Sequence, residues 1–232
     1  MIGWVGDYYN PVDHITYTRL SALREVNWDV KTQSLVANPV PELLNLRSSS
    51  LASEHIAALP VNSVPHVIAK TGAGAAASSD IVLKFSGFNA ANPNPNPAGT
   101  IFTFGTCVLG DGTAGSGMGI TVSISPGPNR THVASIAGAS LCGGPGVAGT
   151  TIPLFADEDV LSVRILADRS VADIFVQGGR WAATIGWVGA PRKPADSNVM
   201  VWSASAGVSA QVDVHAMGCG WLNPSYTDKP TL

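Results

Sequence analysis

The densest group of residues that could act on a substrate is a run of three acids, Asp157, Glu158 and Asp159. Adjacent carboxylates can bind Ca²⁺, but the further oxygen ligands that a calcium loop needs do not follow at regular spacing. Paired carboxyl groups also cleave glycosidic bonds, yet none of the 16 acidic residues stands in a recognisable catalytic setting. We therefore interpret the run as a solvated turn, and Asp168 and Asp173, in and after a predicted hairpin turn, as structural residues.

A glycine-rich segment at residues 110–115 fits the pattern Gly-x-Gly-x-x-Gly. A dinucleotide site needs a helix after this pattern, because the amides of the helix N-terminus hold the pyrophosphate. The segment is instead followed by more glycine and by the alternating residues of a strand that begins at Ile120. We interpret it as a flexible hairpin loop.

Histidine, cysteine and serine form no recognisable catalytic or metal-binding pattern. The histidines lack the short spacing and the neighbouring cysteine pairs of zinc sites, and no serine lies in a Gly-x-Ser-x-Gly turn. The sequence therefore predicts no metal and no cofactor. The histidines are His14, His55, His66, His132 and His215.

Tryptophans in the C-terminal part of the chain allow two interpretations. Their faces could stack on sugar rings, but tryptophan is more often a packing residue, and we favour packing. The four residues are Trp181, Trp187, Trp202 and Trp221.

Charge and composition exclude several classes of partner. The 232 residues include 13 basic and 16 acidic side chains, a net charge of -3, with no basic cluster suited to nucleic acid. No apolar stretch approaches the ~20 residues of a membrane span. The chain starts inside an apolar segment, residues 1–6, which suggests a fragment of a longer protein.

Three cysteines, Cys107, Cys142 and Cys219, allow at most one internal disulfide, and the sequence leaves the pairing open. Asn129 begins the sequon Asn-Arg-Thr and is a candidate glycosylation site. The similar segment that begins at Asn223 has proline in its middle position, which excludes it as a sequon.

Alternation with a period of two is the strongest structural pattern. It occurs around residues 81–85, 120–124, 161–165 and 208–216, and Asp168 begins a turn that predicts a hairpin with the strand at 171–176. Weaker patterns predict strands at 101–109, 133–136 and 199–202. Residues 41–47 predict one short helix, with a break at residues 48–50. The economical fold is all-β: two antiparallel sheets in a concanavalin- or lectin-like sandwich.

The segment 161–180 resembles the C-terminal module of glycoside hydrolase family 32, the family of invertases, inulinases and fructosyltransferases. The resemblance depends on the Asp-Arg-Ser turn at Asp168, Arg169 and Ser170 and on the acid before Phe-Val, Asp173 with Phe175. Residues 3–6 with 23–26, the helix at 41–47 and the strand at 212–217 are similar to other family segments. At Leu23 the family usually has proline.

The resemblance implies a domain division and a role. Residues 1–30 would be the tail of a preceding β-propeller and a handover strand, 31–60 a linker with the short helix, and 61–232 the sandwich. Family members cleave or transfer β-fructosyl units with acids in Asn-Asp-Pro, Arg-Asp-Pro and Glu-Cys motifs of the propeller. None of these motifs occurs here, so the chain has no catalytic residue to which a role can be assigned.

We therefore expect the supporting C-terminal sandwich of a β-fructofuranosidase-like hydrolase, whose partner is a catalytic propeller acting on sucrose- or fructan-type sugars. Exposed apolar surface at Trp4 and in the segment around residues 20–29 would favour self-association, and family members are often secreted or vacuolar. Two alternatives stay open: a stand-alone lectin-like module, and one subunit of an enzyme whose catalytic part is a separate chain.

Overall fold

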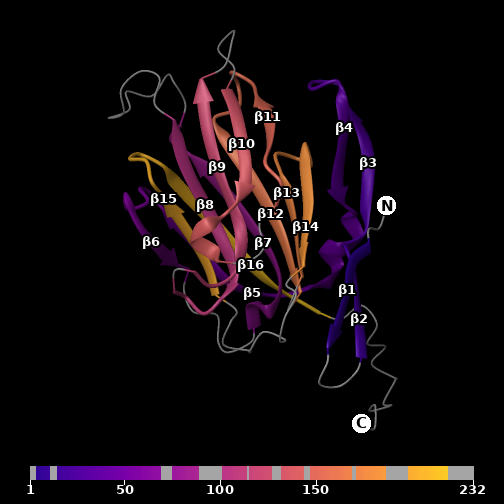
Figure 1. The fold of residues 1–232 in the computed structure, drawn as a ribbon. Coiled ribbons are helices and arrows are strands. Elements are labelled where there is room, and N and C mark those ends of the chain that lie inside the picture. Colours follow the sequence, from indigo (N-terminus) through magenta and orange to yellow (C-terminus); the bar gives the residue numbers. More distant parts are fainter. Residues whose placement is uncertain are drawn as a thin grey trace.

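The computed structural model describes residues 4–10, 15–68, 75–88, 101–113, 115–126, 132–143, 147–168, 171–186 and 198–218. Most of its strands form two antiparallel sheets that face each other, and two short hairpins lie beside this sandwich (Figure 1). The predicted all-β sandwich is therefore confirmed. Within the described part of the chain, no helix has the length and apolar character that a membrane crossing requires.

The first sheet has six strands, each paired antiparallel with its neighbours. In spatial order these are β14 (Trp181–Gly186), β13 (Val171–Val176), β12 (Val160–Asp168), β7 (Ser78–Ser86), β16 (Ser209–Met217) and β5 (Arg47–Ile56). The predicted hairpin is the β12–β13 pair, in which Asp168 is paired with Val171.

The second sheet has five strands, and a further strand, β6 (Asn62–Val67), lies beside its β15 edge. Ile68 donates a backbone hydrogen bond to Val199 at 2.9 Å next to this edge. The five strands in spatial order are β11 (Thr150–Leu154), β10 (His132–Gly138), β9 (Met118–Pro126), β8 (Phe102–Gly110) and β15 (Asn198–Ser203).

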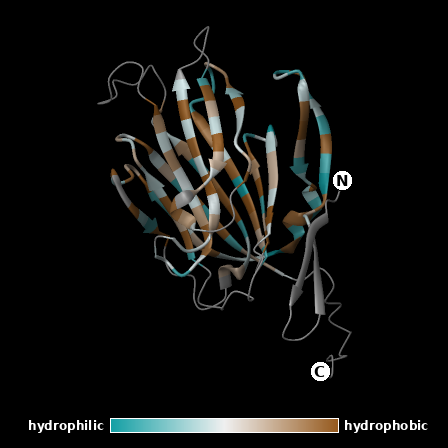
Figure 2. Ribbon diagram, in the orientation of Figure 1, coloured by the Kyte–Doolittle hydropathy of each residue, from teal (hydrophilic) through white to brown (hydrophobic). Residues whose placement is uncertain are grey.

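The core lies between the two sheets. On β7 the side chains of Ile81, Leu83 and Phe85 are buried, whereas Lys84 between them is exposed. The ring centroids of Phe85 and Phe104, from opposite sheets, are 4.6 Å apart. Figure 2 shows the same alternation as bands along the strands. Burial of one face of each strand therefore accounts for the period of two in the sequence.

Two features of the connections differ from the prediction. The predicted helix is a 3-10 helix, η1 (Pro41–Leu46), with proline in its first turn and no side-chain cap. The predicted break at residues 48–50 is wrong, because these serines belong to β5, where they are exposed on the outermost strand of the six-stranded sheet. A polar run on such a strand lacks the apolar alternation that identifies a buried one.

Two hairpins precede the sandwich along the chain. They are β1 (Trp4–Asn10) with β2 (Ile15–Leu20), and β3 (Arg24–Asp29) with β4 (Ser34–Pro39). Neither hairpin is part of the two large sheets. The residues predicted as a linker, 31–60, therefore contain β4 and also β5, which is a sandwich strand.

The glycine-rich segment at 110–115 connects β8 to β9, which are antiparallel neighbours. Its interpretation as a hairpin loop is thus confirmed, because no helix follows. Hydrogen bonds from the hydroxyl groups of Ser116 and Thr113 lower the pKa of Asp111 to about 2. The carboxylate therefore stabilises its own turn by accepting hydrogen bonds within it.

Candidate functional site

The most developed polar arrangement outside the core lies where the β3–β4 hairpin meets the sandwich. Two groups of residues join them, which we call the Asp173 anchor (Ala22, Arg24, Asp173, Thr184) and the Glu158 anchor (Asp29, Lys31, Asp157, Glu158, Arg180). Together with a backbone contact between them, they form a seam from one end of the hairpin to the other.

The Asp173 anchor holds the start of β3. Asp173 lies on β13, its side chain is 5% exposed, and it accepts hydrogen bonds from the Ala22 amide at 2.8 Å and from Arg24 Nη2 at 2.7 Å. Thr184, its cross-strand neighbour on β14, donates a third hydrogen bond through its hydroxyl group. The Arg24 guanidinium also lies 5.1 Å from the centroid of the Phe175 ring. A charge buried this deeply needs all of these partners.

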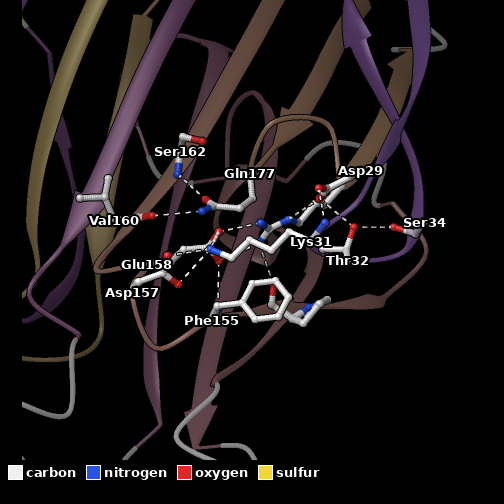
Figure 3. Close-up of polar contacts among 12 residues, drawn as sticks. Asp29, Lys31, Thr32, Ser34, Phe155, Asp157, Glu158, Val160, Ser162 and Gln177 are labelled. Carbon is white, nitrogen blue, oxygen red and sulfur yellow. Dashed lines mark hydrogen bonds and ion pairs between the residues drawn. The ribbon is translucent and has the colours of Figure 1, made fainter.

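The Glu158 anchor holds the turn of the hairpin (Figure 3). Arg180 donates two hydrogen bonds to the Glu158 carboxylate, at 2.7 and 2.6 Å, in a bidentate pair. Lys31 Nζ lies 2.9 Å from an oxygen of Asp157 and 3.3 Å from Glu158 Oε1. Arg180 Nε is also 3.6 Å from Asp29 Oδ2. The turn is thereby tied both to the β11–β12 loop and to the β13–β14 turn.

The carboxyl groups of the Glu158 anchor are held in their ionised form. Burial opposes ionisation of Glu158, but hydrogen bonds from Arg180 and from the Phe155 amide outweigh it and lower the pKa of Glu158. A hydrogen bond from the Thr32 hydroxyl lowers the pKa of Asp29, and one from Lys31 lowers the pKa of Asp157. Lys31 and Arg180 also lie over the Phe155 ring, at 4.7 and 5.2 Å from its centroid.

A backbone hydrogen bond lies between the two anchors. Ala37 of β4 donates to the carbonyl of Gly179 at 2.9 Å. Gly179 has φ of +79°, and a Cβ atom there would lie 2.5 Å from the Ala37 carbonyl oxygen. Glycine is therefore required at this position both by the backbone conformation and by the close approach of the hairpin.

A third ionic group fixes the chain where it enters the sandwich. Asp80 on β7 is completely buried and accepts hydrogen bonds from Arg164 at 2.9 and 2.6 Å and from Arg47 at 2.8 Å. Burial opposes ionisation of Asp80, but the two guanidinium groups outweigh it and lower its pKa. Arg47 directly follows η1, so this group attaches the end of the connection to the sheet.

The acids that the sequence singled out are placed differently from one another. Asp173 and Phe175 lie in the seam, Asp168 is exposed at the end of β12, and Arg169 and Ser170 lie outside the described residues. The interpretation of the acidic run as a solvated turn is wrong for Glu158, whose side chain is only 13% exposed. Its partner Arg180 is 22 residues away in the chain, so no local pattern could have revealed the pair.

The other candidate residues do not form a site among the described residues. Trp202 is buried and Trp181 is half-buried against the core, whereas Trp187, Trp221, His14 and Asn129 lie outside the described residues. His66 pairs with Glu54 at 2.6 Å, His55 is exposed, and His132 and His215 are half-buried. In the part of the chain that the structure describes, no group of three metal-ligating side chains comes together.

The cysteine pairing that the sequence left open is resolved by the structure. Cys107 on β8 and Cys142 form a disulfide across 35 residues, and both are buried. Cys219 lies outside the described residues.

The fold has clear counterparts among solved structures. Fructan 1-exohydrolase IIa from Cichorium intybus matches with a TM-score of 0.68 and 15% identity, over 94% of this chain and 45% of its own. Exo-inulinase from Aspergillus awamori matches with a TM-score of 0.61 and 16% identity, over 95% of this chain and 40% of its own. The GH32 β-fructofuranosidase from Bombyx mori matches with a TM-score of 0.50 and 13% identity, over 94% of this chain and 37% of its own.

The chain has the fold of the C-terminal part of these enzymes. The resemblance that the sequence predicted is therefore confirmed at the level of the fold. The chain spans less than half the length of each of the three proteins. No family model matches the sequence, and the search of curated proteins finds no match.

Proposed function

We propose that this chain is the non-catalytic C-terminal β-sandwich of a β-fructofuranosidase-like glycoside hydrolase, and that it supports a catalytic β-propeller. The observation that carries the proposal is the match of nearly the whole chain to the C-terminal part of fructan- and inulin-cleaving enzymes. The absence of the three acidic motifs from the sequence supports it, because glycosidic cleavage needs a positioned nucleophile or base and a proton donor.

The proposal includes a domain division. The β1–β2 and β3–β4 hairpins would be the handover from the propeller, η1 would be the short linker, and the sandwich would begin at β5. The seam would then keep the handover segment in a fixed position on the sandwich. Sucrose- or fructan-type sugars would bind to the propeller.

A complementation experiment tests this function. The catalytic propeller, joined to this chain in one polypeptide or supplied as a separate subunit, should release fructose from sucrose or inulin and should lose stability without the chain. A propeller of unchanged activity and thermal stability in the absence of the chain would contradict a supporting role.

A further inference from the structure

The outward side of the five-stranded sheet carries a row of hydroxyl groups that crosses four neighbouring strands, β8, β9, β10 and β11 (Figure 1). Thr103 of β8 stands directly opposite Ser123 of β9. Ser123 in turn stands opposite Ser135 of β10, and Ser135 stands opposite Thr151 of β11. The apolar residues that alternate with them along the strands are buried, so the four hydroxyl groups point away from the core. We call these four residues the hydroxyl row.

The hydroxyl row is a regular line that solvent reaches. Neighbouring strands lie about 4.8 Å apart, so its four members extend over about 14 Å. Ser135 and Thr151 are exposed, and Thr103 and Ser123 are half-buried. Thr103 Oγ1 and Ser123 Oγ are 3.2 Å apart and share one hydrogen bond, which leaves acceptor capacity on both oxygens.

This face lacks the charged side chains that usually cover the outside of a sheet. Among the described residues at outward positions of β8, β9, β10 and β11, none is charged. The outward positions of the six-stranded sheet, in contrast, include Lys84, Arg164 and Asp213. Because the two outer faces belong to one molecule, the low charge of the chain as a whole does not account for the difference.

Trp202 provides a second observation on the same face. It lies on β15 opposite Gly105 of β8, where a Cβ atom would be 2.7 Å from the indole Cζ2 and 2.8 Å from Cε2. The indole therefore extends across Gly105, two residues from Thr103. Trp202 is 6% exposed, and its Nε1 is a buried donor without a hydrogen-bond partner. A donor left unpaired in this way is costly, and its presence beside the hydroxyl row favours an acceptor that a ligand supplies.

The 3-10 helix η4 (Ser140–Cys142) covers one end of the face. The disulfide attaches Cys142 to Cys107 of β8, and a Cβ atom at Gly119 would lie 2.9 Å from the Cys142 Sγ. The open part of the face therefore begins at the next outward residue of β9, Thr121, which is half-buried and adds a further hydroxyl group.

From these observations we infer that the outward face of β8 to β11 binds a neutral polysaccharide, with the hydroxyl row and Trp202 as its hydrogen-bonding groups. Serine and threonine hydroxyls donate and accept hydrogen bonds, as sugar hydroxyls do. A polymer presents such groups at repeated intervals, so several weak contacts form together. Trp202 Nε1 is enclosed in the free chain, so the indole must move outward for a sugar oxygen to reach it.

Other classes of partner fit this face less well. Nucleic acid and anionic lipid are bound through lysine and arginine, which the described outward positions of these four strands do not carry. A protein interface has an apolar centre with aromatic residues, whereas the centre of this face consists of hydroxyl groups.

Affinity electrophoresis of the purified 232-residue chain tests the inference. Native gels are cast with inulin, levan or dextran, and a matched gel is cast with polygalacturonate, which is anionic. We expect at least one neutral polymer to retard the chain and polygalacturonate to have no effect. Retardation by polygalacturonate alone, or by none of the polymers, would overturn the inference.

A double variant assigns the binding to the hydroxyl row. Ser135→Ala/Thr151→Ala removes two exposed hydroxyl groups and should weaken binding about tenfold. The matched control Ser49→Ala/Ser50→Ala removes two exposed serine hydroxyls from β5, on the other sheet, and should change binding by no more than about twofold. Equal affinity of the two variants would show that the polysaccharide binds elsewhere.

The indole N–H signals of the unaltered chain, observed by NMR with ¹⁵N-labelled tryptophan, give a measurement that needs no folded variant. The signal of Trp202 should shift when the retarding polymer is added, and that of Trp28, which is 60% exposed on β3, should not. An unchanged Trp202 signal in the presence of a bound polymer would remove this residue from the site and contradict the inference.

This inference goes beyond the proposed function, and the two can fail separately. A chain that stabilises a propeller but binds no polysaccharide would end the inference and leave the function standing. A chain that binds polysaccharide through the hydroxyl row while no propeller depends on it would do the reverse. A dimeric mass by sedimentation that the Ser135→Ala/Thr151→Ala variant abolishes, without polysaccharide binding, would assign the face to a second copy and overturn the inference.

Discussion

The sandwich core and the β3–β4 hairpin are held in place by different kinds of interaction. Between the two sheets, Phe85 and Phe104 pack ring against ring with neighbours that are completely buried. The hairpin instead meets the sandwich through Asp173 and Glu158 and their cationic partners. Apolar packing in the core involves no titratable group, whereas the hydrogen-bonded charges of the seam fix one geometry and depend on each partner.

The difference suggests that the two regions can lose structure separately. Removal of apolar volume should destabilise the whole sandwich, because its strands share one core. Removal of a seam residue should release the hairpin while the sheets persist, in the manner of a local unfolding unit. The following predictions, from the largest expected effect to the smallest, test this contrast.

The largest effect is expected from Phe85→Ala. The cavity between the sheets should lower the free energy of unfolding by about 3–5 kcal/mol, measured by urea denaturation followed by far-UV circular dichroism. Trp28→Ala, a change at an exposed aromatic residue of β3, is the control and should stay within about 0.5 kcal/mol. Equal losses from the two variants would remove the distinction between core and hairpin.

Asp173→Ala should release the hairpin by leaving the Arg24 guanidinium without its carboxylate. We expect local opening of residues 22–39 to become easier by about 3 kcal/mol, read as faster amide hydrogen exchange there but not in β7 or β12. Asp168→Ala, which changes an exposed acid at the neighbouring turn, should leave this exchange unchanged. Uniformly faster exchange throughout the sandwich would show that the hairpin is not a separate unit.

Gly179→Ala tests the backbone contact of the seam, with Gly178→Ala as its control. Both glycines have positive φ, +79° and +61°, but a Cβ atom at Gly178 meets no atom within 4 Å. The strain of a positive φ is therefore common to both variants, and the difference between them reports the clash with Ala37. We expect Gly179→Ala to cost about 2 kcal/mol more in hairpin protection. Equal costs would mean that the approach of β4 is not tight.

The smallest effect is expected from acid. The carboxyl groups of Asp29, Asp157 and Glu158 have pKa values below their ordinary values of 3.8 and 4.5. Their contribution is therefore complete above about pH 5 and is lost as the pH falls through the lowered values. Hairpin protection should decrease only slightly over that window, because solvent screens the exposed pairs. A Glu158→Gln variant with the same pH profile as the wild type would contradict this assignment.

The sandwich could be predicted from the sequence because its signal is local. Ile120, Val122 and Ile124 alternate with hydroxyl residues within five positions, and burial of one face of β9 reproduces that alternation. The start of β5 carries no such signal, because its outermost position leaves serines exposed on both sides of the strand. Strands that face the core therefore show an alternating apolar pattern in the sequence, whereas the exposed part of an outermost strand does not.

The seam could not be predicted, because its partners come together only in the folded chain. Arg24 and Asp173 are 149 residues apart, and Lys31 and Glu158 are 127 residues apart. The family resemblance draws attention to Asp173 as a structural residue, but nothing near it in the sequence identifies Arg24 as its partner. Glu158 belongs to a run of three acids, a pattern that favours a solvated turn, and its partner Arg180 is not adjacent to it in the sequence.

Whether this chain is the supporting part of a sugar-cleaving enzyme is tested most directly with the purified 232-residue protein itself. It should be incubated with sucrose and with inulin, and free fructose should be measured over time. We expect no fructose above the rate without protein, because no pair of acids in the sequence stands in a catalytic motif. Fructose release by the isolated chain would contradict this conclusion.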